Sequence, residues 1–189
     1  MKRVAISIKV FLILTIITGI VYPLIITLFA QLSFPENANG SMVYVNGRQI
    51  GSKLLGQNFD TIHYFVLRPS ATNYNTMPSG GSNLGPTSSV LKDLVLEREQ
   101  NFRIQNNLKN NEIIPEDMLM SSASGLDPHI SPTSAKIQVQ RIAKIRNFTP
   151  EQTNKLLLLI NSLTEQPQYH LFGCPRINVL LLNLELDKI

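Results

Sequence analysis

Charge, cysteine and tryptophan are all scarce in this chain of 189 residues. Only 16% of the residues are charged, one residue is cysteine (Cys174) and none is tryptophan. The single cysteine excludes an intrachain disulfide. Because tryptophan is absent and aromatic residues make up only 7% of the chain, a carbohydrate-stacking surface is disfavoured. Stability therefore has to come from packing or from partner subunits.

The longest stretch without charge runs from Val10 to Pro35. About 20 apolar residues in a helix cross a hydrocarbon core, so this run predicts a transmembrane helix and its exit. A cleaved signal peptide has a shorter apolar region, and cleavage after Ala30 would put Leu28 where a small residue is needed. A soluble core helix seldom lacks a polar face over such a length. We therefore expect an uncleaved anchor in preference to both alternatives.

Pro23 lies inside this run and removes one backbone hydrogen bond, which predicts a kink after Tyr22. Tyr22 and Thr27 are candidate packing positions against another membrane helix, with simple lipid exposure as the favoured alternative. Tyr22 and Pro23 are also partner or structural candidates.

The basic residues nearest to the run precede it (Lys2, Arg3 and Lys9), and the next one is Arg48. The positive-inside rule then predicts three parts: a cytoplasmic tail (1–9), a transmembrane helix with its exit (10–35) and an extracytoplasmic domain (36–189). Without the tail, the chain has 14 basic and 13 acidic residues. This balance leaves no electrostatic footprint for nucleic acid, so we expect no nucleic-acid partner.

The outer region predicts both strands and helices. Asn46-Gly47 is typical of a two-residue hairpin turn, and strands are expected at 62–67 and at 175–184, the latter buried on both faces. Helical patterns and caps predict helices at about 89–108, from Ser131-Pro132 to Arg146 and from the capping box at Thr149, with a short turn at 115–117. The expected fold is a single N-terminal transmembrane α-helix plus one mixed α/β (α+β) extracytoplasmic domain.

A long polar loop at 70–88 contains Ser79-Gly80-Gly81-Ser82 ahead of a helix start. Backbone N–H groups in such a loop can bind phosphate, which makes these four residues a nucleotide candidate. No Gly-Lys-Ser/Thr closes the loop, so it is not a P-loop. A solvated or partner-facing loop is the favoured alternative.

Asp127-Pro128-His129 puts a carboxylate two residues from an imidazole, which suggests a metal site, acid–base chemistry or a hydrogen-bonded brace. No second His or Cys stands at ligand spacing, so we expect the brace and no metal. Three arginines in strongly punctuated stretches are candidates to clamp a carboxylate or a carbonyl, within the domain or on a partner: Arg68, Arg141 and Arg176.

The motifs contain no set of catalytic residues. There is no Gly-x-Ser-x-Gly elbow, and Cys174 has no evident base partner. We therefore expect that the chain is not an enzyme on its own.

Taken together, an ordered series of motifs resembles the C subunit of the Kdp potassium-transporting ATPase. The matching stretches span nearly the whole chain: 18–24 (TGIVYPL), 51–59, 64–71, 79–87 (SGGSNLGPT), 123–132 (ASGLDPHISP), 138–143 (QVQRIA) and 175–180 (PRINVL). The chain departs from the family pattern at Cys174, where an acidic residue is common, and at 166–172.

The resemblance implies a bacterial inner-membrane complex. Its partners would be a channel-like potassium-binding subunit, a P-type ATPase subunit and a very small single-helix subunit. The role usually given to this subunit is a catalytic chaperone that raises the ATP affinity of the pump subunit. ATP would then act indirectly, potassium would be handled by the complex, and no cofactor is expected on this chain.

The expected topology conflicts with direct nucleotide contact, because ATP is cytoplasmic and the Ser79 loop is expected outside. One alternative is that the outer domain caps or gates the potassium entrance of the channel-like subunit, with Asn83 and Asp127 as candidate residues, since carbonyl and hydroxyl oxygens can replace a cation's water. An alternative of another class is a membrane-anchored extracytoplasmic binding module unrelated to transport.

Overall fold

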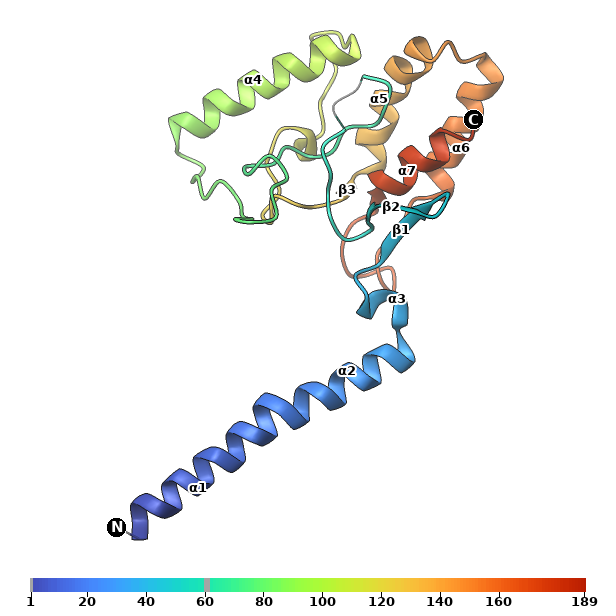
Figure 1. The fold of residues 1–189 in the computed structure, drawn as a ribbon. Helices are drawn as coiled ribbons and strands as arrows, with labels where there is room; N and C mark the ends of the chain where they lie inside the picture. Colours follow the sequence, from blue (N-terminus) through green and yellow to red (C-terminus); the bar gives the residue numbers. More distant parts are fainter. Residues whose placement is uncertain (1, 60–61) are drawn as a thin grey trace. The chain divides into compact units, whose positions relative to one another are not determined.

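A long apolar helix begins this computed structural model, which describes residues 2–59 and 62–189. Met1 of the expected tail and residues 60–61 of the expected outer domain lie outside the described residues. The chain divides into two compact units, 1–52 and 53–189, and each is described by itself. Figure 1 gives the element labels.

The first unit contains the helix and the predicted hairpin. Helical backbone runs through α1 (Lys2–Ile16), η1 (Ile17–Val21) and α2 (Tyr22–Ser33), and this stretch is long and apolar enough to cross a membrane. A short helix, α3 (Pro35–Ala38), precedes the strands β1 (Met42–Val45) and β2 (Arg48–Ser52). The strands pair antiparallel with the turn at Asn46-Gly47, which confirms the predicted hairpin.

A π-helical turn, η1, ends just before Tyr22-Pro23. Proline lacks the N–H that would continue the regular ladder, and a widened turn is one way to accommodate that loss. The backbone therefore departs from α-geometry at the position where a kink was predicted. Membrane insertion, the packing roles of Tyr22 and Thr27 and the partner or structural role of Pro23 stay predictions.

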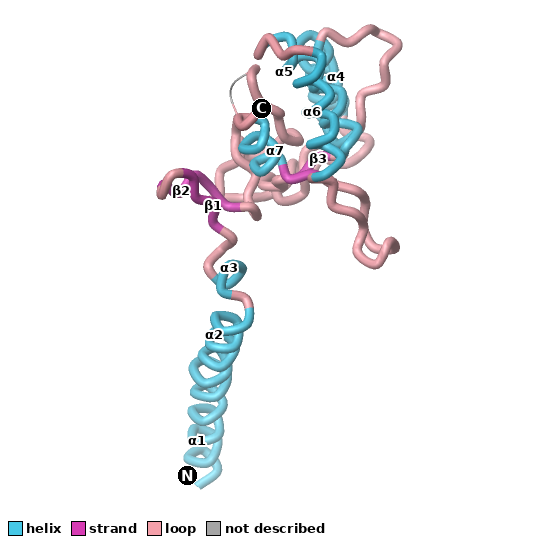
Figure 2. The backbone as a smooth tube through the Cα atoms, turned by 90° about the vertical axis from the view of Figure 1, so that its right-hand side faces the viewer, coloured by secondary structure: helices cyan, strands magenta, loops and turns pink. Residues whose placement is uncertain are grey.

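Helices make up most of the regular secondary structure of the second unit, as Figure 2 shows. They are α4 (Ser89–Asn106), the short 3-10 turn η2 (Glu116–Met118), α5 (Pro132–Ile145), α6 (Pro150–Ser162) and α7 (Val179–Leu186). The predicted caps at Ser131 and Thr149 are confirmed: each accepts a hydrogen bond from a backbone N–H three residues on, and Thr149 forms a full capping box with Gln152. Ser88 caps α4 in the same way. Two short strands, β3 (His129–Ile130) and β4 (Ile177–Asn178), pair antiparallel.

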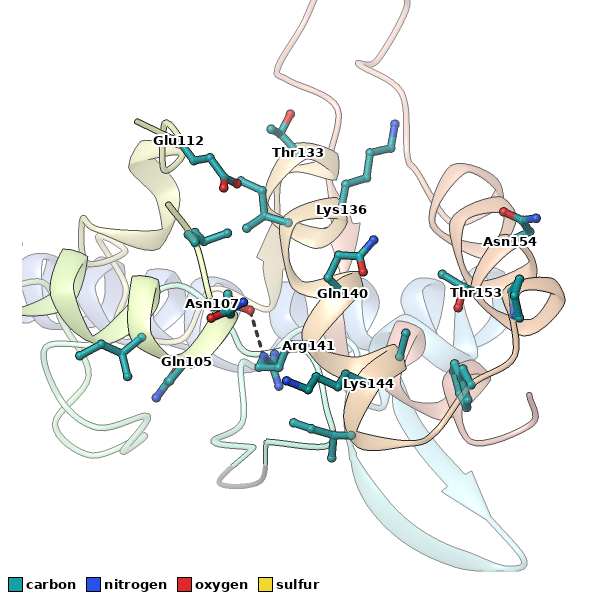
Figure 3. Close-up of a pocket in the computed structure, with 18 residues that line it drawn as sticks. Gln105, Asn107, Glu112, Thr133, Lys136, Gln140, Arg141, Lys144, Thr153 and Asn154 are labelled. Atoms are coloured by element: carbon teal, nitrogen blue, oxygen red, sulfur yellow. Dashed lines mark hydrogen bonds between the residues drawn. The ribbon is translucent and has the colours of Figure 1, made fainter. Parts of the chain in front are cut away.

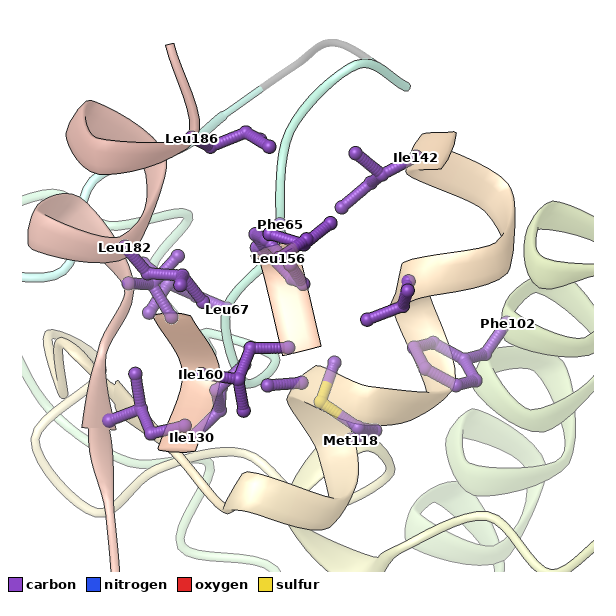
Figure 4. Close-up of a cluster of buried hydrophobic side chains, with 14 of the residues drawn as sticks. Phe65, Leu67, Phe102, Met118, Ile130, Ile142, Leu156, Ile160, Leu182 and Leu186 are labelled. Carbon is purple, nitrogen blue, oxygen red and sulfur yellow. The ribbon is translucent and has the colours of Figure 1, made fainter. Parts of the chain in front are cut away.

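The apolar core lies among α5, α6, α7 and the segment 62–67 (Figure 4). Its fully buried side chains include Phe65 from the segment, Ile142 from α5, Leu156 and Ile160 from α6 and Leu182 from α7. Each large side chain of this kind contributes about 1.5–3 kcal/mol when it leaves water. The core therefore depends on how segment 62–67 is held against the helices.

The predicted strand at 62–67 is wrong, because this segment pairs with side chains and not with another strand. The amide of Asn183 accepts from Phe65 N (2.9 Å) and donates to Phe65 O (3.0 Å), while Gln138 does the same for Val66 (2.8 and 3.2 Å). Arg141 donates to the carbonyls of Ile62 and Tyr64. The backbone N–H and C=O groups of Phe65 and Val66 are therefore satisfied without a ladder.

The predicted strand at 175–184 is also wrong beyond its first residues. Only Ile177 and Asn178 are in β4, and the chain then turns into α7 with the side chain of Asn178 accepting from Leu181 N (3.2 Å). Residues buried on most sides of a helix are apolar at both parities, just as in a central strand. Periodicity alone therefore cannot separate the two structures.

Candidate functional site

The Ser79–Ser82 loop lies against a second loop, residues 121–127. Ser70 Oγ donates to Gly125 O (2.7 Å), and Ser122 N donates to Pro69 O (3.1 Å). Gly125 has a φ of +70°, and a Cβ there would come within 2.7 Å of Gly80 O. A Cβ on Gly81 would reach 3.0 Å from Ala123 O. The glycines therefore permit close backbone packing between the two loops.

The residues of this loop provide few groups that would bind phosphate. Residues 70–88 contain no charged side chain, and phosphate loops use a lysine as well as backbone N–H groups. The next helix, α4, starts at Ser89, and its N-terminus is capped by Ser88. Ser79, Ser82 and Asn83 are exposed. The nucleotide assignment of Ser79–Ser82 stays a prediction.

Four of the residues singled out from the sequence line one cavity of about 660 Å³: Arg68, Asp127, His129 and Arg176. Cys174 lines it as well. These residues come from three separate stretches of the chain, so the fold brings together side chains whose proximity the sequence did not reveal. We treat this cavity as the candidate site.

Asp127 holds the centre of the site through three interactions. Its Oδ2 pairs with Nη1 of Arg68 (3.1 Å), and its Oδ1 accepts from the backbone N–H of His129 (3.1 Å) and lies 3.2 Å from Nδ1 of that residue. Burial acts to raise the pKa of Asp127, but the hydrogen bonds from His129 and the charge of Arg68 outweigh it, so the pKa lies below its usual value. Asp127 and His129 therefore form the expected brace. Among the described residues, no group of three metal-ligating side chains is present.

Arg68 also anchors the loop that leads to Ser79. Tyr74 Oη donates to the carbonyl of Arg68 (2.7 Å), and burial raises the pKa of Tyr74. Nε of Arg68 is buried and has no hydrogen-bond partner in the part of the chain that the structure describes. This buried donor of the guanidinium is therefore unpaired among the described residues.

Arg176 and Arg141 differ in what they clamp. Arg176 Nε donates to Oε2 of Glu165 (2.9 Å) at the surface, where both side chains are half exposed. Arg141 is buried away from the site; besides the carbonyls of the 62–67 segment, it binds Oδ1 of Asn106 (3.0 Å) and Oε1 of Gln138 (2.9 Å). Burial lowers the pKa of Arg141 to about 10. All three arginines thus clamp groups within the domain, one of the two options expected.

Sequence reasoning missed four polar residues, of which three are buried and one, Asp117, is partly buried. Gln138, Asn183 and Asn106 hold the backbone or Arg141, and Asp117 accepts from Ser131 N (2.7 Å) and Ser134 Oγ (2.6 Å) next to the site. A single amide among apolar residues is the signal that could have revealed Asn183 in α7. Gln138 gives no such signal, because Ser134 and Arg141 are buried on the same helix.

Comparison with known proteins assigns the chain to a family. Residues 4–188 match the family described as KdpC, the K+-transporting ATPase c chain. The chain is 44% identical to the potassium-transporting ATPase KdpC subunit of Dechloromonas aromatica over 97% of this chain and 95% of that protein. It is 46% identical to the KdpC subunit of Polynucleobacter asymbioticus (94% and 93% covered) and 45% identical to that of Geotalea uraniireducens (100% and 99% covered). The match extends from the apolar helix through the cavity to the last helix, and the chain belongs to the KdpC family of potassium-transporting ATPase subunits.

Proposed function

We propose that this chain is an accessory, non-catalytic subunit whose folded domain lies outside the cytoplasmic membrane and caps the potassium entrance of the channel-like subunit. The observation that carries the proposal is the charge around the apolar helix: Lys2, Arg3 and Lys9 precede it, and no basic residue follows before Arg48. A potassium importer takes up its ion from the side on which this rule puts the domain. Family membership leaves no support for a module unrelated to transport.

The candidate site supports a role that depends on shape and polarity. Arg68, Asp127 and His129 brace the polar loops at 70–88 and 121–127 in one arrangement. These loops are rich in hydroxyl and carbonyl oxygens, groups that can replace part of the water around a cation. A braced set of oxygens at the pore entrance would shape the approach of potassium while the domain holds the subunits together.

The family role of raising the ATP affinity of the pump subunit is compatible with this topology only as an indirect effect. The Ser79–Ser82 loop has no cation of its own, and ATP would lie on the other side of the membrane. The helical stretch from Lys2 to Ser33 is the part of this chain suited to carry such an influence across the bilayer. ATP is then a ligand of the pump subunit and not of this chain.

Cysteine accessibility in intact cells tests the topology. The variant carries Cys174→Ser and Ser82→Cys, so its single cysteine is at position 82. Intact cells are treated with a charged, membrane-impermeant thiol reagent, and permeabilised cells are the control. Labelling in intact cells is the expected result. Protection that disappears only on permeabilisation would overturn the proposal and bring back direct nucleotide contact.

Potassium dependence of ATP hydrolysis by the assembled complex tests the cap. We expect Asp127→Asn and Asn83→Ala to raise the potassium concentration for half-maximal activity several-fold. Asp93→Asn, an exposed carboxylate on α4, is the matched control and should leave it unchanged. Unchanged assembly and potassium affinity in Asp127→Asn and Asn83→Ala would count against the cap.

A further inference from the structure

A second and larger cavity, of about 1340 Å³, is lined by none of the residues that line the candidate site. Its walls are the end of α4 with the loop that follows, the outer face of α5 and the start of α6. Figure 3 shows α5 running between the other two walls, with Lys136, Gln140 and Lys144 projecting from it. None of the residues in the candidate site, and none of the family roles above, uses this groove.

The groove carries cations that the domain does not neutralise. Lys136, Gln140 and Lys144 follow one another at spacings of four residues, so they share one face of α5. All three are exposed, and within residues 62–189 no hydrogen bond or ion pair of the two ammonium groups is found. α5 contains no acidic residue. The lysines are therefore available to an acidic partner.

Among the described residues that line the groove, one is acidic, Glu112, against the two lysines. Glu112 Oε1 accepts a hydrogen bond from the backbone N–H of Lys109 (3.0 Å) and so closes its own loop. Arg141 lines the groove too, but its guanidinium donates to Oδ1 of Asn106 and to buried carbonyls. The net charge presented to a partner is therefore positive.

Apolar and amide groups complete the surface. Ile104 is 78% exposed, and Leu108, Ile137 and Phe148 lie partly buried along the walls. Gln105, Gln140 and Asn154 offer side-chain amides that form no hydrogen bond with the described part of the chain. Apolar contact, amide groups and unpaired cations in one open groove are the combination that binds a polypeptide segment.

We propose that this groove is a docking surface for an acidic segment of another subunit of the potassium-transporting complex. Lys136 and Lys144 are eight residues apart on one helix, so the segment would carry carboxylates about 12 Å apart, flanked by an apolar residue that covers Ile104. Pairing at such a surface steers association and sets register more than it adds affinity. The proposal rests on family membership, which implies partner subunits. It does not depend on which side of the membrane the domain lies.

Site-specific photo-crosslinking in the intact complex tests the occupant. A photoreactive residue replaces Gln140, and in a separate variant it replaces Lys92, an exposed residue of α4 outside the groove. We expect Gln140 to crosslink a peptide of a partner subunit that contains Asp or Glu, and Lys92 not to do so. A crosslink to lipid alone, or no crosslink in a complex that is assembled, would overturn the proposal.

Charge reversal tests whether the two lysines contribute to partner binding. Lys136→Glu and Lys144→Glu should each reduce partner recovery in salt-washed purifications at least about fivefold, and Lys92→Glu should not. Changing the crosslinked carboxylate of the partner to lysine should restore recovery with Lys136→Glu or Lys144→Glu. If Lys136→Glu and Lys144→Glu are recovered with the partner as well as Lys92→Glu is, the proposal is contradicted. Thermal unfolding of each purified variant is the folding control: an unchanged unfolding temperature shows that a loss of recovery does not come from misfolding. Because labelling at Ser82 does not depend on this groove, failure here and failure of the proposed topology give different results.

Discussion

Asn183 pairs with the backbone of Phe65 in the way that a neighbouring strand would, through one accepted and one donated hydrogen bond of 2.9 and 3.0 Å. Both residues are at most 2% exposed. The amide of Gln138 repeats the arrangement at Val66. Two side-chain amides from α7 and α5 thus take the place of a sheet, and they hold the segment that contributes Phe65 to the core.

Replacing Asn183 with leucine should therefore cost more than an ordinary polar substitution. Asn183→Leu keeps the volume but leaves the N–H and the carbonyl of Phe65 buried without partners, so we expect a loss of about 2–4 kcal/mol. Thermal and denaturant unfolding of the purified full chain measures it. Asn161→Leu, at an exposed position of α6, is the control, and its effect should stay within about 0.5 kcal/mol. Equal effects of the two changes would contradict this reading of Asn183.

Arg141→Lys should destabilise the fold although it keeps the positive charge. The planar guanidinium serves Asn106, Gln138 and two main-chain carbonyls at once, and a single ammonium cannot reach all of them. We expect a loss of about 2 kcal/mol or more in the same unfolding measurements. Arg176→Lys, which changes a half-exposed surface pair, should cost less than about 1 kcal/mol. A small loss for Arg141→Lys would show that water can enter and satisfy these acceptors.

The Asp127 brace predicts a pH dependence of stability. The pKa of Asp127 is lowered in the folded chain, so its ionised form stabilises the fold above the unfolded pKa, about 4, and this contribution disappears as the pH falls through the folded value. The stability difference between the wild type and Asp127→Asn should thus be largest near neutral pH and shrink below about pH 4. Asp93→Asn should show no such trend. A difference that grows on acidification would have the wrong sign.

Close packing between the two polar loops predicts opposite outcomes at two glycines. Gly125→Ala puts a methyl group within 2.8 Å of Thr72 Oγ1 and of a main-chain oxygen, at a positive φ, so we expect a loss of about 2 kcal/mol or more and faster proteolysis of residues 70–88. Gly80→Ala has open space around its Cβ and should unfold like the wild type. Similar protease sensitivity of Gly125→Ala and Gly80→Ala would mean that the loops are not held together in solution.

Local signals account for what the sequence by itself determined. The apolar helix, the hairpin at Asn46-Gly47, the caps at Ser88, Ser131 and Thr149 and the family resemblance all depend on residues close together in the chain. A cap or a two-residue turn is satisfied by its own neighbours, so its structure can be predicted without the rest of the molecule.

Long-range contacts decided the remainder. Segment 62–67 has the pattern of a strand, but its backbone partners are side chains more than 70 residues away, and α7 is helical because the core surrounds its leucines. Arg68 and Arg176 were singled out from local punctuation and Asp127 from its spacing to His129. Only the fold shows that these three line one cavity and that Arg141 does not line it. Burial and hydrogen-bond pairing between distant residues are properties of the tertiary structure, because the same residue type is a surface group or a buried clamp according to what packs against it.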